Sequence, residues 1–382
     1  MGLALNLRPA VNALGPVTPE LRADTGLTGT AAGALLALPT LSFAALGLVA
    51  AAVAARFGTH RTVVAALVAL VIGQLVRTGV GGVPALFVGS VIALAGVAIS
   101  NVLMPGLVRL HFPQQIPAMT AVYTTTLSIG AAIASGVTLP IEHALSAGWR
   151  LGLALWIIPA AAALVPWVLL ARRTRPPAAR AGSSRVPLRK LAGTRLAWVM
   201  AGYFGTQALQ AYVVFGWLPE ILTSGGTSDT VAALWLSLLA VIGVVISALV
   251  PAILARVPVL AVVITMAASY LLGYLGLIVD AGGATWLWVV LIGIGTGAFP
   301  VALTLIGLRA RSAGGTLALS GFAQSLGYLI ASVGPFLFGV VHDLTGGWTV
   351  SLWMLMGLVL VHLGFGLAAS RTRYIEDELT LD

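Results

Sequence analysis

Residues 84–108 read PALFVGSVIALAGVAISNVLMPGLV, an unbroken run of 25 residues without a charged side chain. A helix crosses the roughly 30 Å hydrocarbon core of a bilayer with about 20 apolar residues. The run is apolar throughout, whereas a membrane-spanning strand would alternate apolar and polar positions. This stretch therefore predicts a transmembrane helix.

Eleven further apolar runs of similar length cover most of the 382-residue chain. They lie at 3–21, 30–54, 61–78, 116–141, 151–171, 196–219, 230–254, 258–279, 285–308, 314–340 and 348–369. Only 8% of the residues are charged, against roughly 25% in a soluble domain, and the mean hydropathy is +1.04. We therefore expect an all-α membrane protein with twelve transmembrane helices, most of whose surface contacts the lipid bilayer.

The basic residues orient these spans. Twelve spans place both termini on one side, and 16 of the 20 Lys and Arg residues then fall in loops or termini on that side. An excess of Lys and Arg marks cytoplasmic loops, so we expect a multi-pass protein of the cell (inner or plasma) membrane with both termini in the cytoplasm. Arg22, Arg77 and Arg150 are expected in outer loops, and Arg8 is the only basic residue expected inside a span.

Several function classes can be set aside at this stage. The formal charge of +9 does not predict nucleic-acid binding, because the basic residues are scattered among short loops. The chain has no cysteine, which excludes disulfides and thiol catalysis. The sequence shows no cluster of metal ligands, no nucleophile with a neighbouring base and no cofactor loop, so we expect neither an enzyme nor a metal or cofactor site.

The two halves of the chain repeat each other at an offset of 195 to 200 residues. Four matches occur in the same order: Pro19-Glu20 with Pro219-Glu220, Ala55-Arg56 with Ala255-Arg256, Met104-Pro105 with Phe299-Pro300, and Ser128 and Gly130 with Ser325 and Gly327. We expect a six-helix bundle over 1–171, a cytoplasmic linker over 172–195, a second bundle over 196–370 and a cytoplasmic tail over 371–382. The linker is rich in Pro, Gly, Ser and Arg, which predicts a flexible, solvated segment.

Two parallel six-span halves are the layout of the major facilitator superfamily, in which the substrate binds near the midplane between halves that rock around it. A channel would not need this organisation. An ATP-driven pump would need a G-x-x-x-x-G-K-[ST] loop, which the sequence lacks. The repeat thus predicts a secondary transporter that works by alternating access.

The loop at 54–61 reads AARFGTHR and resembles the superfamily signature that locks helices together on the cytoplasmic side. The resemblance implies a gating role for Arg56, Gly58 and Arg61. Ala55 stands where the signature has Asp, so the interhelical charge contact of that Asp must be absent or replaced.

More specific motifs run along the whole chain. They are NLRPA at 6–10 with Gly15-Pro16, NVLMP at 101–105, FP at 112–113, MTAVYT at 119–124, GWRL at 148–151, WLP at 217–219, QSLGY at 324–328, and HD at 342–343 before GGW at 346–348. Together they resemble the cyanate transporter and nitroimidazole transporter family within the superfamily, with the first two motifs the most discriminating. The resemblance implies movement of a small, often anionic or weakly acidic molecule.

Arg8 is the leading candidate for a substrate contact. A charge inside a span is a functional hypothesis by default, and a guanidinium presents a planar fork of donors to a carboxylate, cyanate or nitro group. Asn12 lies one turn further along the same face. The alternative is that Arg8, with only seven residues before it, reaches the cytoplasmic headgroups.

Uncharged polar residues in other spans complete the expected substrate site. They could equally be packing contacts, since hydrogen bonds between membrane helices are worth only about 0.6 kcal/mol on average. The set draws on both halves of the chain and consists of Asn101, Tyr123, Gln207, Gln210, Gln324 and Tyr328.

These residues favour a transporter of a small organic or inorganic anion that acts as a monomer. An exporter of nitroaromatic drugs is the alternative, and a membrane sensor is disfavoured because no signalling domain is appended. Proton-driven transporters commonly carry Asp, Glu or His inside the bundle, whereas Glu20, Glu142 and Glu220 lie at outer span ends. Uniport, exchange, or a proton carried on a weakly acidic substrate therefore fits better than a buried carboxylate relay.

Overall fold

The computed structural model describes residues 1–14, 17, 21, 24–27, 29–145, 148–173, 188–280 and 283–379. The first half of the chain forms α1 (Gly2–Asn6), α2 (Pro9–Asn12), α4 (Gly29–Phe57), α5 (Thr59–Gly79), α6 (Val83–His111), α7 (Ile116–Leu145), α8 (Gly148–Ala154) and α9 (Ile157–Arg173). The second half forms α10 (Leu188–Gly193), α11 (Arg195–Ser224), α12 (Asp229–Arg256), α13 (Val259–Val279), α14 (Thr285–Gly295), α15 (Ala298–Leu308), α16 (Ala313–Thr345), α17 (Trp348–Ser370) and α18 (Ile375–Leu379).

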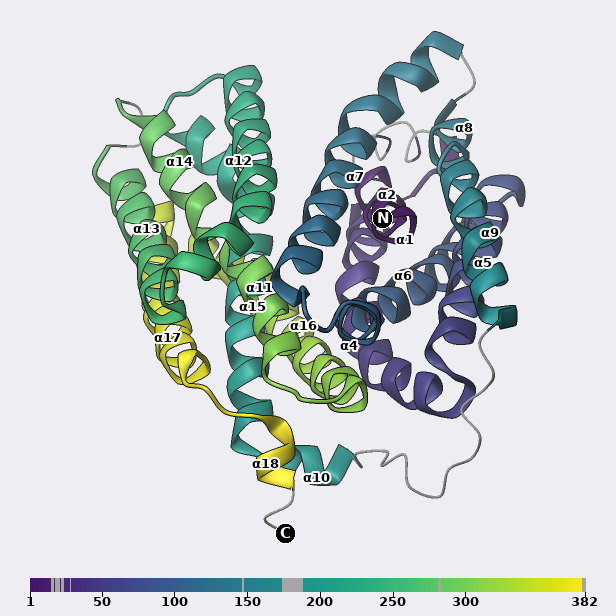
Figure 1. Ribbon diagram of the computed structural model, residues 1–382. Helices are drawn as coiled ribbons and strands as arrows, with labels where there is room; N and C mark the ends of the chain where they lie inside the picture. The colour runs from purple at the N-terminus through teal and green to yellow at the C-terminus, as the bar shows by residue number, and fades with distance from the viewer. Residues whose placement is uncertain are drawn as a thin grey trace.

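The helices gather into two bundles, α1–α9 and α11–α17 (Figure 1). The bundles lie close together at the end of the molecule that carries α10 and α18, called here the α18 end, and they diverge toward the opposite end (Figure 1). Between the bundles, α4 and α6 pack against α16, and α7 packs against α12 and α15. Any group shared by the two halves must therefore lie beside these helices.

The helix boundaries agree with the apolar runs to within a few residues, and the interruptions are informative. The runs at 61–78, 84–108 and 258–279 correspond to α5, α6 and α13. The run at 3–21 is interrupted at 7–8, just before Pro9, and the run at 285–308 is interrupted at 296–297, inside a glycine-rich stretch. Proline lacks the amide hydrogen and glycine weakens a helix, so both breaks have a local cause.

Within the described residues, nine helical segments are long and apolar enough to cross a membrane, or ten if the bent pair Leu38–Leu46 and Val49–Phe57 within α4 is one span. The structure therefore shows an all-α membrane protein. The count of twelve stays a prediction, because the first span continues into residues outside the described ranges and α11 is not among the segments that meet the length and hydropathy test. Gly15, Pro16, Pro19 and Glu20 lie there as well.

Glycine lets α5 and α6 approach until their backbones touch. A Cβ atom at Gly73 would overlap the backbone nitrogen of Ala93, and one at Gly89 would lie 2.7 Å from Cβ of Arg77. Small residues permit such close crossings in membranes, where packing replaces the hydrophobic effect as the driving force. The two helices therefore form one tightly packed unit.

The end of the predicted linker is helical rather than flexible. Residues 174–187 lie outside the described ranges, but α10 follows them, and its Leu191 is buried. Leu191 belongs to the main hydrophobic core. Burial of this leucine explains why the segment is ordered despite its polar composition.

The predicted cytoplasmic tail is also folded against the second bundle. The carboxylate of Glu376 accepts hydrogen bonds from the backbone N–H groups of Arg311 and Ser312, each at 3.0 Å, and from the Ser312 hydroxyl at 2.8 Å. The carboxylate of Glu378 accepts from the backbone N–H of Leu196 at 2.9 Å. These acidic residues satisfy backbone donors at the starts of α16 and α11, where the helix dipole favours negative charge.

Candidate functional site

The break in the first span positions Arg8. α1 ends at Asn6, whose side-chain amide donates to the carbonyls of Gly2 at 2.8 Å and Pro159 at 3.0 Å. Arg8 then precedes α2, with Pro9 in the first helical position. Because α1 is tied to α9 by Asn6, the half-buried Arg8 side chain is carried on a fixed segment of the first bundle.

The neighbours of Arg8 come from the second bundle. Its guanidinium carbon lies 5.7 Å from the ring centroid of Phe299 in α15, a distance at which the positive charge is attracted to the ring face. The guanidinium also exerts an electrostatic effect on the hydroxyls of Tyr212 in α11 and Tyr328 in α16. The charge of Arg8 thus acts on the second bundle through one ring face and two tyrosine hydroxyls.

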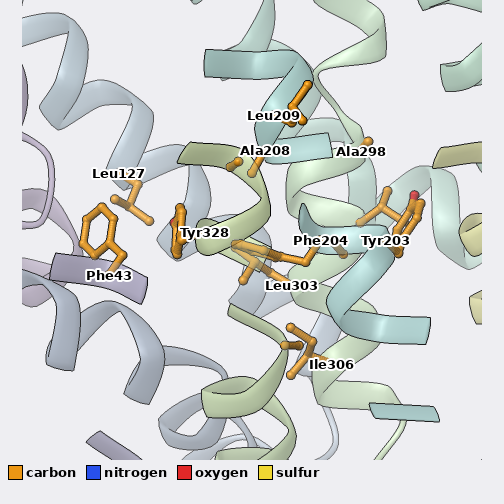
Figure 2. Close-up of a cluster of buried hydrophobic side chains, with 14 of the residues drawn as sticks. Phe43, Leu127, Tyr203, Phe204, Ala208, Leu209, Ala298, Leu303, Ile306 and Tyr328 are labelled. Atoms are coloured by element: carbon orange, nitrogen blue, oxygen red, sulfur yellow. The ribbon is translucent and has the colours of Figure 1, made fainter. Parts of the chain in front are cut away.

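These rings belong to an aromatic cluster consisting of Phe43, Phe204, Tyr212, Phe299 and Tyr328. The ring of Tyr328 lies 4.7 Å from Phe43, 5.1 Å from Phe204 and 6.4 Å from Tyr212, measured between centroids. Figure 2 shows Phe43 and Tyr328 facing each other across the boundary between the bundles. The cluster offers flat apolar faces next to the guanidinium of Arg8.

A chain of buried hydrogen bonds joins the bundles next to this cluster. The Asn101 amide in α6 donates to Oε1 of Gln324 at 2.9 Å and to the Tyr328 hydroxyl at 3.4 Å. Gln324 donates in turn to Ser320 at 2.7 Å, and Ser320 donates to the backbone carbonyl of Val102 at 2.7 Å. The link therefore holds α6 against α16 and fixes the position of the Tyr328 ring.

Five of the eight predicted substrate contacts come together here: Arg8, Asn101, Tyr123, Gln324 and Tyr328. The buried hydroxyl of Tyr123 makes no hydrogen bond and lies near Tyr328. Asn12 is half-buried in α2, one turn from Arg8.

Gln210 faces away from this group. Its side chain donates to the carbonyl of Leu355 in α17 at 3.1 Å and accepts from the Tyr274 hydroxyl in α13 at 2.8 Å. Gln207 lies on the same face of α11, is buried, and has neither side-chain polar atom hydrogen-bonded. Both glutamines are thus oriented toward the interior of the second bundle.

The glycine of the predicted loop motif has a structural role. Gly58 adopts φ of 90° and precedes α5, a conformation that favours glycine. The Arg56 guanidinium lies over the Phe57 ring, and Arg61 is exposed in the first turn of α5. Next to Arg61, the Nε2 atoms of His60 and His111 are 2.9 Å apart, which connects the start of α5 to the end of α6.

The sequence interpretation of Arg77 is wrong. Arg77 lies inside α5 with its side chain fully buried, not in an outer loop, so Arg8 is not the only basic residue within a span. Its position one residue before the end of the apolar run at 61–78 looks like the start of an outer loop in a hydropathy profile. Phe43, Phe204, Tyr212 and Phe299 were also missed, because aromatic residues in apolar runs are usually packing residues.

The fold and the group around Arg8 define a helical membrane protein of two bundles that share a polar and aromatic site. The sequence matches the Major Facilitator Superfamily over residues 7–335. The chain belongs to this superfamily of transporters, which are not enzymes.

Relatives extend over nearly the whole chain. The chain is 38% identical over 380 residues to the "Uncharacterized transporter YycB" of Bacillus subtilis strain 168, covering 98% of this chain and 92% of that protein. It is 36% identical over 383 residues to the "2-nitroimidazole transporter" of Escherichia coli K12, covering 98% and 94%. It is 26% identical over 372 residues to the "Cyanate transport protein CynX" of the same organism, covering 95% of each. The resemblance inferred from the motifs is confirmed.

Solved structures show the same fold. The proton:xylose symporter XylE superimposes with a TM-score of 0.78 at 16% identity, covering 100% of this chain and 96% of that one. At this identity the similarity concerns the fold alone.

Proposed function

We propose that this protein moves a small, planar anionic or weakly acidic molecule across the cell membrane by alternating access. The observation that carries the proposal is the position of Arg8: a cation on the first bundle that faces Phe299, Tyr212 and Tyr328 of the second. A ligand bound between these groups would contact both bundles at once. That is the requirement for coupling substrate binding to their relative motion.

Each part of the site has a separate role in this proposal. The Arg8 guanidinium donates to the anionic or nitro group, since charge-assisted hydrogen bonds are about twice as strong as neutral ones. The aromatic cluster packs against the planar body of the ligand. Asn101 and Gln324 hold the closed side of the site through their cross-bundle hydrogen bond.

The proposed topology identifies which state of the transport cycle the structure represents. Twelve spans with cytoplasmic termini, in two halves over 1–171 and 196–370 joined by 172–195, place the α18 end in the cytoplasm. The bundles are in contact at that end, where Nη1 of Arg109 in α6 donates to the carbonyl of Gly307 in α15 at 3.3 Å. The structure then corresponds to an outward-facing state of a transporter that acts as a monomer.

The described carboxylates favour transport without a buried acidic relay. Asp24 pairs with Arg150 at 3.2 Å, Glu220 is exposed near the end of α11, and Asp280 follows the last residue of α13. Each lies at a helix end that water reaches. Uniport, exchange, or a proton carried on the substrate therefore accounts best for these placements.

Thermal-shift titration of the purified full chain in detergent tests the proposal. The ligands are sodium cyanate, 2-nitroimidazole and 4-hydroxybenzoate, because they vary charge and ring size separately. We expect saturable stabilisation by at least one of them, a loss of about 10-fold or more in apparent affinity in Arg8→Ala, and a smaller loss in Arg8→Lys. Arg256→Ala, an exposed arginine at the end of α12, is the matched control and should bind like the wild type. Unchanged affinity in both Arg8 variants would refute the role of Arg8.

Export of nitroaromatic compounds is a second candidate, favoured by the aromatic cluster. It predicts net flux of the compound out of the cell. Uptake of 2-nitroimidazole into right-side-out vesicles, compared with inside-out vesicles of the same preparation, distinguishes the two. Faster accumulation in inside-out vesicles would favour export.

A further inference from the structure

Arg77 is the most unusual side chain in the first bundle. It is 1% exposed, and one guanidinium nitrogen, Nη1, donates to the backbone carbonyl of Ala10 at 3.2 Å. The two other nitrogens, Nε and Nη2, have no hydrogen-bond partner. The described part of the chain contains no carboxylate paired with Arg77.

Burying this guanidinium without a counter-charge costs free energy, so we expect Arg77 to have a function that offsets the cost. A guanidinium cannot lose its proton near neutral pH. Removing it from water without a counter-charge is among the most unfavourable events in a membrane protein. Anchoring Ala10 uses one of its nitrogens and leaves donors on two others, so that bond alone does not account for Arg77.

Two more buried residues of the same pair of helices carry polar atoms without a hydrogen-bond partner. Gln74, one turn earlier on the same face of α5, is buried with both side-chain polar atoms unpaired, and the Ser90 hydroxyl in α6 is buried and unpaired as well. Ser90 follows Gly89, at which a Cβ would lie 2.7 Å from Cβ of Arg77.

These groups have a consistent chemistry. Natural proteins leave few buried polar groups unpaired, and here they occur in three residues of one helix crossing. The unpaired atoms are mostly donors: two guanidinium nitrogens, an amide nitrogen and a hydroxyl, with one amide oxygen as acceptor. A buried positive charge with buried N–H and O–H donors on the same pair of helices is suited to a small anion.

We propose that Arg77, Gln74 and Ser90 form a binding site for a small monovalent inorganic anion, of the class of chloride or nitrate, inside the first bundle. This site is separate from the group around Arg8 and does not depend on the transported substrate. The bound anion neutralises Arg77. Because Arg77 also holds Ala10, two residues after Arg8, occupancy stabilises the segment that carries Arg8.

The test uses the full chain purified in a gluconate buffer, with gluconate as the large anion that the site cannot admit. Chloride, bromide and nitrate are titrated against gluconate at constant ionic strength while the melting temperature is recorded. We expect a saturable rise with the small anions, absent in Arg77→Gln and retained in Arg8→Ala. Gln210→Leu, a buried glutamine of the second bundle, is the matched control and should keep the rise.

Milder variants keep the test decisive if Arg77→Gln does not fold. Ser90→Ala and Gln74→Leu should each weaken the apparent anion affinity several-fold, and anomalous scattering from bromide-soaked crystals should peak beside Arg77. The proposal is overturned if the rise survives in the Arg77 and Ser90 variants, or if gluconate produces it equally. It is also overturned if the rise disappears in Arg8→Ala, because the anion then binds at the proposed transport site.

Discussion

Two helices at equivalent positions of the repeat, α5 and α13, show how the two halves have diverged on a shared framework. α5 and α13 begin and end 200 residues apart. In the first half, Arg77 of α5 donates to the carbonyl of Ala10. In the second half, Tyr274 of α13 donates to Gln210, the residue 200 positions after Ala10.

The residues around Arg8, between the bundles, show the same difference between the two halves. The first half supplies its cation, Arg8, whereas four of the five members of the aromatic cluster, Phe204, Tyr212, Phe299 and Tyr328, belong to the second half. At these two places the first half supplies the cation, whereas the second half supplies rings and neutral hydrogen bonds. The repeat preserves the positions of helices while the chemistry on them is free to differ.

The largest expected difference between the halves concerns the glycines at equivalent positions of α5 and α13. A Cβ at Gly73 would overlap the backbone of Ala93, whereas one at Gly273 would lie 2.6 Å from a side-chain atom of Ile292. Gly73→Ala should cost about 3 kcal/mol or more, because two helices must separate, and Gly273→Ala about 1 to 2 kcal/mol. Melting temperatures in one detergent measure both. Equal losses would mean that the two crossings are equally tolerant.

The next effect concerns the α18 segment, which caps only the second bundle. Burial would raise the pKa of Glu376, but hydrogen bonds from Arg311 and Ser312 outweigh it and hold the pKa below its usual value. The stabilisation is therefore complete above the unfolded pKa of about 4.3 and is lost as the pH falls through the lower folded pKa. Glu376→Gln should cost about 1 kcal/mol at pH 7.

Melting curves between pH 3 and pH 7 check this sign. The gap between the wild type and Glu376→Gln should close as the pH falls, while the exposed control Arg256→Ala follows the wild type throughout. A gap that widened toward low pH would contradict the assigned direction.

An effect of similar size is expected where the two halves meet at Arg8. Phe299→Leu keeps an apolar side chain but removes the ring facing the guanidinium. The loss should be about 1 kcal/mol, seen as a weaker apparent affinity for whichever anion stabilises the wild type. Leu303→Met, a buried substitution in the same helix, is the control for general repacking of α15. An unchanged affinity in Phe299→Leu would show that Phe299 is not part of the proposed site.

The smallest effect concerns the hydrogen bond that replaces the Arg77 contact in the second half. A double-mutant cycle of Tyr274→Phe and Gln210→Leu should give a coupling of about 0.6 kcal/mol. Transport should be unchanged, because Gln210 faces α13 and α17. Loss of transport in Tyr274→Phe without loss of stability would return Gln210 to the list of substrate contacts.

The parts of the fold that could be predicted are those set by length and hydropathy. The bounds of α5, α6, α13 and α17 follow from apolar runs that must match a fixed bilayer thickness. The meeting of Arg8, Asn101, Gln324 and Tyr328 could also be predicted, because the repeat places their helices on both sides of one boundary. Which polar residue faces that boundary could not, and Gln210 shows why: a glutamine looks the same whether it faces a partner helix or a site.

Arg77 and the tail were missed for different reasons. A hydropathy profile treats an arginine near the end of a run as a loop residue, since it contains no information about where a long side chain extends. The tail, for its part, reads as a solvated acidic segment. Its order depends on backbone donors at Arg311, Ser312 and Leu196, which are distant in sequence and belong to helix ends that composition does not reveal.

The close contact between Gly106 of α6 and Leu317 of α16, where an added Cβ would lie 2.6 Å from the leucine Cγ, makes this helix pair a direct reporter of the transport cycle. Because the sequence contains no cysteine, two introduced thiols, one on each helix, can form only one intramolecular disulfide. Such bonds require Cα atoms within about 4.4–6.8 Å of each other. The rate of crosslinking at this pair would then measure the fraction of time that the bundles spend closed at the α18 end, in intact cells and without knowledge of the substrate.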